Sequence, residues 1–212
     1  MPVFVDREER RRQVVAVASR LIADAGLEGV TVRDVAEAAQ CSTAIVSHYF
    51  RNKRELLFLT YNSSIEVATE RCDVALAAAD GDLKAYVAEL MPLDEERLIE
   101  WKIWLAFWAR AIADPEIAEI QRQCVLNTRG NILRVMEDLE ATGLLRPGLD
   151  LAGESRQLLS MLIGMAVQVV FDARDWPAKR QHETIELALA KLYRPDRTRP
   201  SDTLARRTAM SA

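Results

Sequence analysis

The sequence is poor in the residues from which metal centres and nucleophilic active sites are built. Its 212 residues include two histidines, His48 and His182, and three cysteines that lie far apart. It contains neither a glycine-rich phosphate loop nor Cys and His residues at the spacing of a ligand set. We therefore expect no metal, no cofactor and no enzymatic activity.

The cysteines are odd in number and show no spacing typical of a disulfide framework. Reduced thiols are expected, and with them a cytoplasmic location. The apolar core of a signal peptide is also missing, because the N-terminal residues are rich in charge. The most apolar run, residues 158–171, is about fourteen residues long and too short to span a bilayer, so no membrane partner is expected.

Charge of one sign does not dominate. The net charge is −4, but acidic residues concentrate in the middle of the chain, whereas the N-terminal segment is almost balanced and the C-terminal segment is basic. Because nucleic-acid binding depends on the local electrostatic field rather than on the net charge of the whole chain, this distribution permits an N-terminal DNA-binding segment.

Apolar residues recur at helical spacing almost throughout, and no stretch alternates as a strand would. The pattern predicts an all-α fold of about nine helices, with breaks at caps, glycines and prolines. The expected helices span residues 6–26, 31–40, 42–49, 52–79, 82–91, 95–113, 115–141, 151–173 and 178–193. Residues 194–212 have too little apolar surface to pack and are predicted to form a disordered tail.

Three closely spaced caps organise the N-terminal part. Thr31 with Asp34, Ser42, and Asn52 with Glu55 each predict a helix start. Two short helices joined by a tight turn, with a supporting helix before them, are typical of a helix-turn-helix. The residues predicted to face its core are Val14, Val15, Ala18, Leu21, Ile22, Ala25, Val32, Val35, Ala36, Ala39, Ile45, Val46, Tyr49 and Phe50.

The stretch from Thr31 to Leu57 resembles the DNA-binding signature of the TetR family. The specific part is the Tyr49-Phe50 pair followed by Lys53 and by Glu55-Leu56-Leu57. The resemblance implies a bacterial transcriptional regulator, most often a repressor, that binds operator DNA as a dimer. It divides the chain into a helix-turn-helix domain (1–53), a ligand-binding and dimerisation domain (54–193) and the tail (194–212).

The segment Trp104-Leu105-Ala106-Phe107-Trp108-Ala109, followed by a helix that starts with proline, resembles the regulatory domain of BetI-type repressors, the choline-responsive branch of the family. One position departs from the family pattern: Gln40 stands in a turn where glycine is common. If this turn adopts a left-handed backbone, a residue with a Cβ costs about 1 kcal/mol there.

In a helix-turn-helix, the start of the second helix meets base edges and the flanking helix starts meet phosphates. The predicted DNA-binding residues are Thr31, Arg33, Ser42, Thr43, Ala44, Ser47, His48, Tyr49 and Lys53. Capping by Thr31 and Ser42, core packing by Tyr49 and a solvated Lys53 are the alternative interpretations. Because no arginine stands on the reading edge, we expect recognition by several weaker contacts and by DNA shape.

Trp101, Trp104 and Trp108 recur at the spacing of one helix face. This stripe is either a cage for an organic cation, assisted by Glu96 or Glu100, or the packing of a hydrophobic interior. The remaining predicted effector-binding residues are Asn127, Met161 and Met165, with Met91 as a further candidate.

The helices at 151–173 and 178–193 carry more apolar surface than one core face requires. In the resembled family these helices form the dimer interface, which implies a homodimer on a palindromic operator; a buried helix pair in a monomer is the other interpretation. Two further functions remain open: a redox- or metal-responsive regulator that uses the cysteines, and a helical adaptor that binds only protein.

Overall fold

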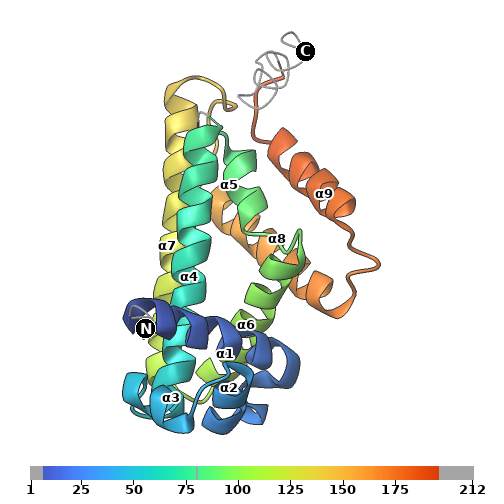
Figure 1. The fold of residues 1–212 in the computed structure, drawn as a ribbon. Coiled ribbons are helices and arrows are strands. Elements are labelled where there is room, and N and C mark those ends of the chain that lie inside the picture. The colour runs from blue at the N-terminus through green and yellow to red at the C-terminus, as the bar shows by residue number, and fades with distance from the viewer. Residues whose placement is uncertain (1–6, 80, 196–212) are drawn as a thin grey trace, which may run out of the picture. The chain divides into compact units, whose positions relative to one another are not determined.

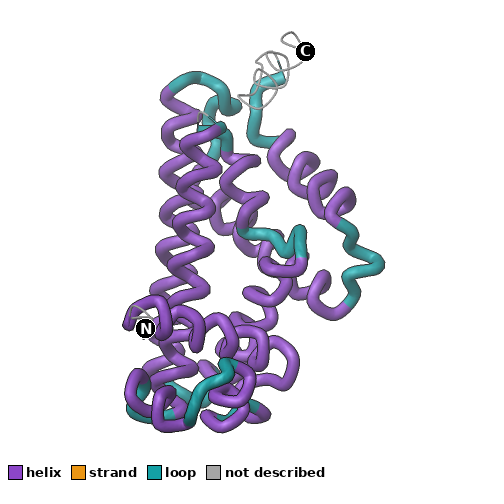
Figure 2. The backbone as a smooth tube through the Cα atoms, in the orientation of Figure 1, coloured by secondary structure: helices purple, strands orange, loops and turns teal. Residues whose placement is uncertain are grey.

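The computed structural model describes residues 7–79 and 81–195, and this part of the chain is all-α (Figures 1 and 2). Nine helices were expected, and nine occur within the described ranges. They are α1 (Arg7–Gly29), α2 (Val32–Ala38), α3 (Thr43–Tyr49), α4 (Lys53–Ala78), α5 (Leu83–Glu89), α6 (Glu95–Ala111), α7 (Pro115–Ala141), α8 (Leu151–Phe171) and α9 (Ala178–Ala190). None of these helices is both long and apolar enough to cross a membrane.

The described residues group into two compact units. The first lies within residues 1–67 and 99–117, and the second within residues 68–98 and 118–212. Helices α4, α6 and α7 each contribute to both units. The predicted tail lies outside the described residues from residue 196 onward, as does the predicted start of the first helix at Asp6.

The core of the helix-turn-helix is built largely as predicted. Val14, Ala18 and Ile22 of α1 are buried, as are Val35 and Ala36 of α2. The prediction for Ala25 is wrong, because this residue is exposed. Gly26 adopts a non-helical backbone with φ 71° and ψ 170° inside α1, and the kink brings Leu27 and Val30 into the core instead.

The prediction for Ile45 is also wrong: this side chain is 38% exposed. Helix α3 has only two turns, and Val46 and Phe50, one turn apart, fill the side that packs inward. A residue adjacent to Val46 is rotated by about 100° around the helix, which places Ile45 on the outer face.

The second unit has its own apolar core, to which Met91, Ile132, Leu162 and Ile185 contribute. Helix α9 ends at Ala190 rather than at the predicted residue 193. The chain leaves the helix there because Tyr193 forms an isolated antiparallel bridge with Leu145.

Candidate DNA-binding surface and effector site

Helix α2 begins with the predicted capping box. The hydroxyl of Thr31 accepts a hydrogen bond from the backbone N–H of Asp34 (3.2 Å), and the Asp34 carboxylate accepts bonds from the Thr31 backbone N–H (2.8 Å) and hydroxyl (2.7 Å). These hydrogen bonds from Thr31 hold the pKa of Asp34 below its ordinary value. The cap fixes the start of α2 and leaves Thr31 exposed to solvent.

The turn between α2 and α3 adopts a left-handed backbone at Gln40, although glutamine carries a Cβ. Gln40 has φ 51°, in the left-handed region, and is the one non-glycine residue with positive φ in the described part of the chain. The next residue, Cys41, donates its N–H to the carbonyl of Ala36 (2.9 Å), which closes the turn. Ser42 then caps α3 by accepting from the N–H of Ile45 (3.3 Å).

Helix α3 presents the predicted reading residues together. Thr43, Ala44, Ser47 and His48 are all exposed, and Val46 is the residue of α3 buried on the opposite side. Tyr49 is half-buried, and its ring lies edge-on against the His48 ring, with 5.3 Å between the ring centres. The exposed face of α3 is therefore small, mostly uncharged and rich in hydroxyls.

Sequence reasoning missed two residues at this surface, Arg10 and Ile45. A hollow of about 280 Å³ is lined by Arg10 of α1 together with Ala44, Ile45, His48 and Tyr49. Arg10 belongs to a run of charges whose pattern does not distinguish one arginine from another. Only the packing of α1 beside α3 places a cation next to the reading face.

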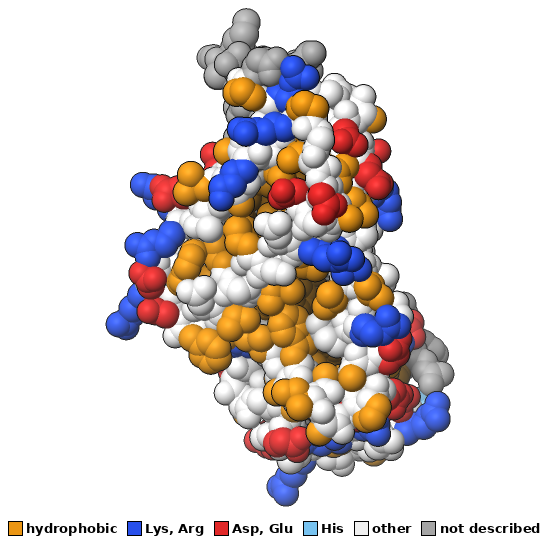
Figure 3. Space-filling view, turned by 180° about the vertical axis from the view of Figure 1, so that it is seen from behind, with side chains coloured by type: hydrophobic (Ala, Val, Ile, Leu, Met, Phe, Trp, Pro, Cys, Tyr) orange, Lys and Arg blue, Asp and Glu red, His pale blue; other side chains and the backbone are white. Residues whose placement is uncertain are grey.

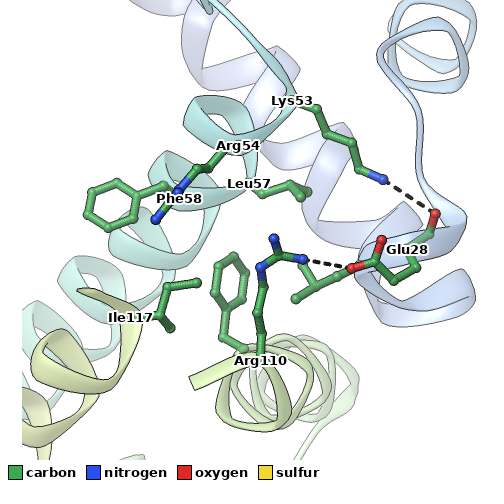
Figure 4. Close-up of a pocket in the computed structure, with 9 residues that line it drawn as sticks. Glu28, Lys53, Arg54, Leu57, Phe58, Arg110 and Ile117 are labelled. Carbon is green, nitrogen blue, oxygen red and sulfur yellow. Dashed lines mark hydrogen bonds and ion pairs between the residues drawn. The ribbon is translucent and has the colours of Figure 1, made fainter. Parts of the chain in front are cut away.

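Lys53, predicted to hold a phosphate, has a partner within the protein. Its Nζ donates to the backbone carbonyl of Glu28 near the end of α1 (3.3 Å), where helix carbonyls lack intrahelical partners (Figure 4). The guanidinium of Arg110 contacts the Glu28 carboxylate at 2.7 Å. Arg54 is paired with Asp114 (3.1 Å) and Glu116 (2.7 Å).

The three predicted tryptophans of α6 form one aromatic cluster in the first unit. The ring of Trp101 lies edge-on to Trp104, at 5.1 Å between centres, and to Trp108, at 5.8 Å. Trp101 is 4% exposed, whereas Trp104 and Trp108 are half-buried. On the same helix, Phe107 stacks on Tyr61 at 4.5 Å.

The other predicted effector residues lie in the second unit. Met165 and Met91 are buried, Met161 is half-buried and Asn127 is exposed on α7. The predicted effector set is therefore divided between the two units. Within the described ranges, no three His, Cys, Asp or Glu side chains come together as a metal site.

Comparison with known proteins identifies the family. Residues 14–59 match the family of bacterial regulatory proteins named after TetR, and residues 79–194 match the C-terminal domain of BetI-type transcriptional repressors. The chain belongs to the TetR family and has a BetI-type C-terminal domain. This regulator is accordingly a DNA-binding protein of the repressor type and not an enzyme, which confirms the prediction.

Two curated relatives illustrate the match. The TetR-family chain is 27% identical over 175 residues to the transcriptional regulator PksA of Bacillus subtilis, covering 81% of the chain and 84% of the relative. It is 37% identical over 133 residues to BetI of Burkholderia mallei, covering 61% of the chain and 67% of the relative.

Solved structures share the fold. A transcriptional regulator from Rhodococcus matches with a TM-score of 0.73 at 25% identity, over 86% of this regulator and 97% of that chain. A regulator from Saccharomonospora viridis, crystallised in complex with choline, matches with a TM-score of 0.81 at 21% identity, over 88% and 99% of the two chains.

Proposed function

We propose that the protein is a ligand-responsive repressor that binds a palindromic operator as a homodimer and is released by a small organic cation. The observation that carries the DNA-binding part is the exposed face of α3, on which Thr43, Ala44, Ser47 and His48 are free to meet base edges. Their opposite neighbour Val46 anchors the helix in the core.

The chemistry of this face supports distributed recognition. Hydroxyls of Thr43 and Ser47 can accept or donate at base edges, and the exposed methyl groups of Ala44 and Ile45 can contact thymine methyls. Without an arginine on α3, no single bidentate guanine contact dominates. We infer an operator read over several positions and partly by shape.

Exposed apolar side chains support a homodimer. Phe171 at the end of α8 is 80% exposed and Leu187 on α9 is 70% exposed. Apolar side chains interrupt the charged surface on the face shown in Figure 3. A second copy of the chain would remove Phe171 and Leu187 from water, and a two-fold dimer matches a palindrome.

The tryptophan cluster supports an organic cation as effector. Indole faces attract quaternary ammonium groups, and Trp104 and Trp108 are half-buried rather than fully enclosed. The related regulator from Saccharomonospora viridis binds choline, which belongs to this chemical class. We therefore take choline as the first probe.

A mobility-shift titration tests the proposal. Purified protein is mixed with the DNA that flanks its own gene at two salt concentrations, with and without choline. We expect a specific shift that weakens with salt and is reversed by choline in the parent but not in Trp108→Ala. Absence of a specific shift refutes operator binding, whereas a shift insensitive to choline and to other quaternary ammonium ions refutes the effector class.

Sedimentation of the protein–DNA complex tests the stoichiometry. We expect two chains on each palindrome. The Leu187→Glu variant is expected to bind as one chain per operator, because the substitution places a charge in the proposed interface. One parent chain on a complete operator would overturn the dimer.

A further inference from the structure

We propose that the cavity beside the end of α1 is a second ligand site, separate from the tryptophan cluster, and that it takes a small aromatic carboxylate. The cavity has a volume of about 220 Å³ and lies entirely within the first unit, between residues of α1, α4, α6 and α7 (Figure 4). It combines a cationic end with an apolar wall.

The cationic end is formed by two side chains that converge on Glu28. The Lys53 ammonium contacts the Glu28 carbonyl at 3.3 Å, and Arg110 contacts the Glu28 carboxylate at 2.7 Å. These three residues all line the cavity. A ligand carboxylate that replaces the Glu28 carboxylate would bind the Arg110 guanidinium by charge-assisted hydrogen bonds, with the Lys53 ammonium nearby at the Glu28 carbonyl.

Glu28 is suited to being displaced. Its side chain is 83% exposed, so its carboxylate approaches Arg110 from the solvent and regains hydration when it leaves. Among the described residues, no ion pair holds the Lys53 ammonium, whose hydrogen-bond partner is a neutral carbonyl. An incoming anion thus meets one cation that no ion pair within the described ranges holds, and one whose carboxylate is easily replaced.

The apolar wall sets the size and character of the ligand. Leu57, Phe107 and Ile117 line the cavity and are each at most 7% exposed. An apolar cavity of about 150 Å³ is large enough to hold benzene, so this larger cavity has room for an aromatic ring and one carboxylate. The space is below the range of about 300 Å³ and more that drug-sized ligands occupy.

Arg54 also lines the cavity but is not part of the proposed anion site. Its guanidinium is held by two carboxylates, at 3.1 Å from Asp114 and 2.7 Å from Glu116. The Asp114 side chain is only 17% exposed, and its departure would leave a partly buried charge unpaired. We therefore expect no ligand carboxylate to bind on the Arg54 side of the cavity.

Calorimetric titration of the full chain with benzoate tests the site. Arg110→Gln removes a charge-assisted bond and is expected to weaken binding about tenfold. Glu28→Gln removes the internal competitor and is expected to strengthen binding several-fold. Benzamide, which has the shape of benzoate without its charge, is expected to bind about tenfold more weakly.

Arg122→Gln is the matched control, because Arg122 is an exposed arginine whose ion pair with Glu119 lies in the second unit. Its benzoate affinity should equal that of the parent. Equal binding of benzoate and benzamide, no loss with Arg110→Gln, weaker binding with Glu28→Gln or no benzoate binding at all would each overturn the proposal. If Arg110→Gln does not fold, the Glu28→Gln and benzamide comparisons decide the question. None of these readouts depends on operator binding.

Discussion

The indole N–H of Trp104 donates a 2.9 Å hydrogen bond to the hydroxyl of Ser64, and that hydroxyl donates to the carbonyl of Tyr61 at 2.7 Å. The polar atom of this tryptophan is therefore used within the protein. Only the faces of its ring remain for an effector, which suits a cation rather than a hydrogen-bond acceptor.

We expect Ser64→Ala to lower the free energy of unfolding by about 1 to 3 kcal/mol, because Ser64 is buried and its loss leaves the Trp104 indole N–H without its acceptor. Chemical denaturation followed by circular dichroism measures the change. Ser63→Ala, one position away on the half-buried side of α4, is the control. Equal losses in the two variants would contradict the assigned role.

Gln40→Gly should stabilise the protein by about 1 kcal/mol, because the backbone at φ 51° is strained for a residue with a Cβ and not for glycine. The midpoint of urea unfolding should rise in proportion. Gln40→Ala keeps the Cβ and should show no such gain. If the alanine variant is stabilised as much as the glycine variant, backbone strain is not the cause.

The capping box makes the stability of the protein depend on acid pH. Hydrogen bonds from Thr31 lower the pKa of Asp34 below its ordinary value of 3.8. The stabilisation is complete above that ordinary value and is lost as the pH falls through the lower folded-state pKa. We expect Asp34→Asn to lower the melting temperature at neutral pH and to make it fall less steeply from about pH 5 to pH 2.

Glu37→Gln on the same helix is the control for the acid dependence, since Glu37 is exposed and takes no part in the capping box. It should retain the pH profile of the parent. An Asp34→Asn profile parallel to the parent's would show that the capping box does not contribute to acid unfolding.

Two serines around α3 should separate capping from base contact. Ser42→Ala removes the bond to the Ile45 N–H and should cost about 1 kcal/mol of stability. Ser47 is exposed in mid-helix, so Ser47→Ala should change stability by less than about 0.5 kcal/mol but weaken operator binding about fivefold. Thermal unfolding and a binding isotherm are measured for both. A Ser47→Ala variant with parental operator affinity would remove this residue from the reading face.

Local signals in the sequence predicted the helices and most of their starts. Thr31 with Asp34, Ser42, and Asn52 with Glu55 all cap as expected, because a cap joins residues only a few positions apart. The left-handed backbone at Gln40 was only a possibility suggested by the glycine common at this position in the resembled family, and the structure shows that it is kept with glutamine. Thr43, Ala44, Ser47 and His48 are exposed on α3, and their contact with DNA stays a prediction.

Features that depend on distant residues were not predictable in this way. The helical spacing of Ala25 and Ile45 predicts that both are buried. Ala25 is exposed beside the kink at Gly26 of α1, and Ile45 is exposed on the short helix α3. The convergence of Lys53 and Arg110 on Glu28 joins residues 25 and 82 positions apart, and no periodic pattern encodes such a meeting. The position of Arg10 beside α3 also joins residues that are far apart in the sequence, so it could not be predicted from a local pattern.

Hydrogen exchange at the bridge between Leu145 and Tyr193 can measure local opening of the second unit. The N–H of Arg146 donates to the Leu192 carbonyl (2.9 Å), and the N–H of Arg194 donates to the Leu144 carbonyl (3.0 Å), although all four residues lie in connecting segments. Loop amides ordinarily exchange their hydrogens quickly with water, whereas these two can exchange only when the end of α9 separates from the α7–α8 connection. Their exchange rates therefore measure how often this part of the regulator opens.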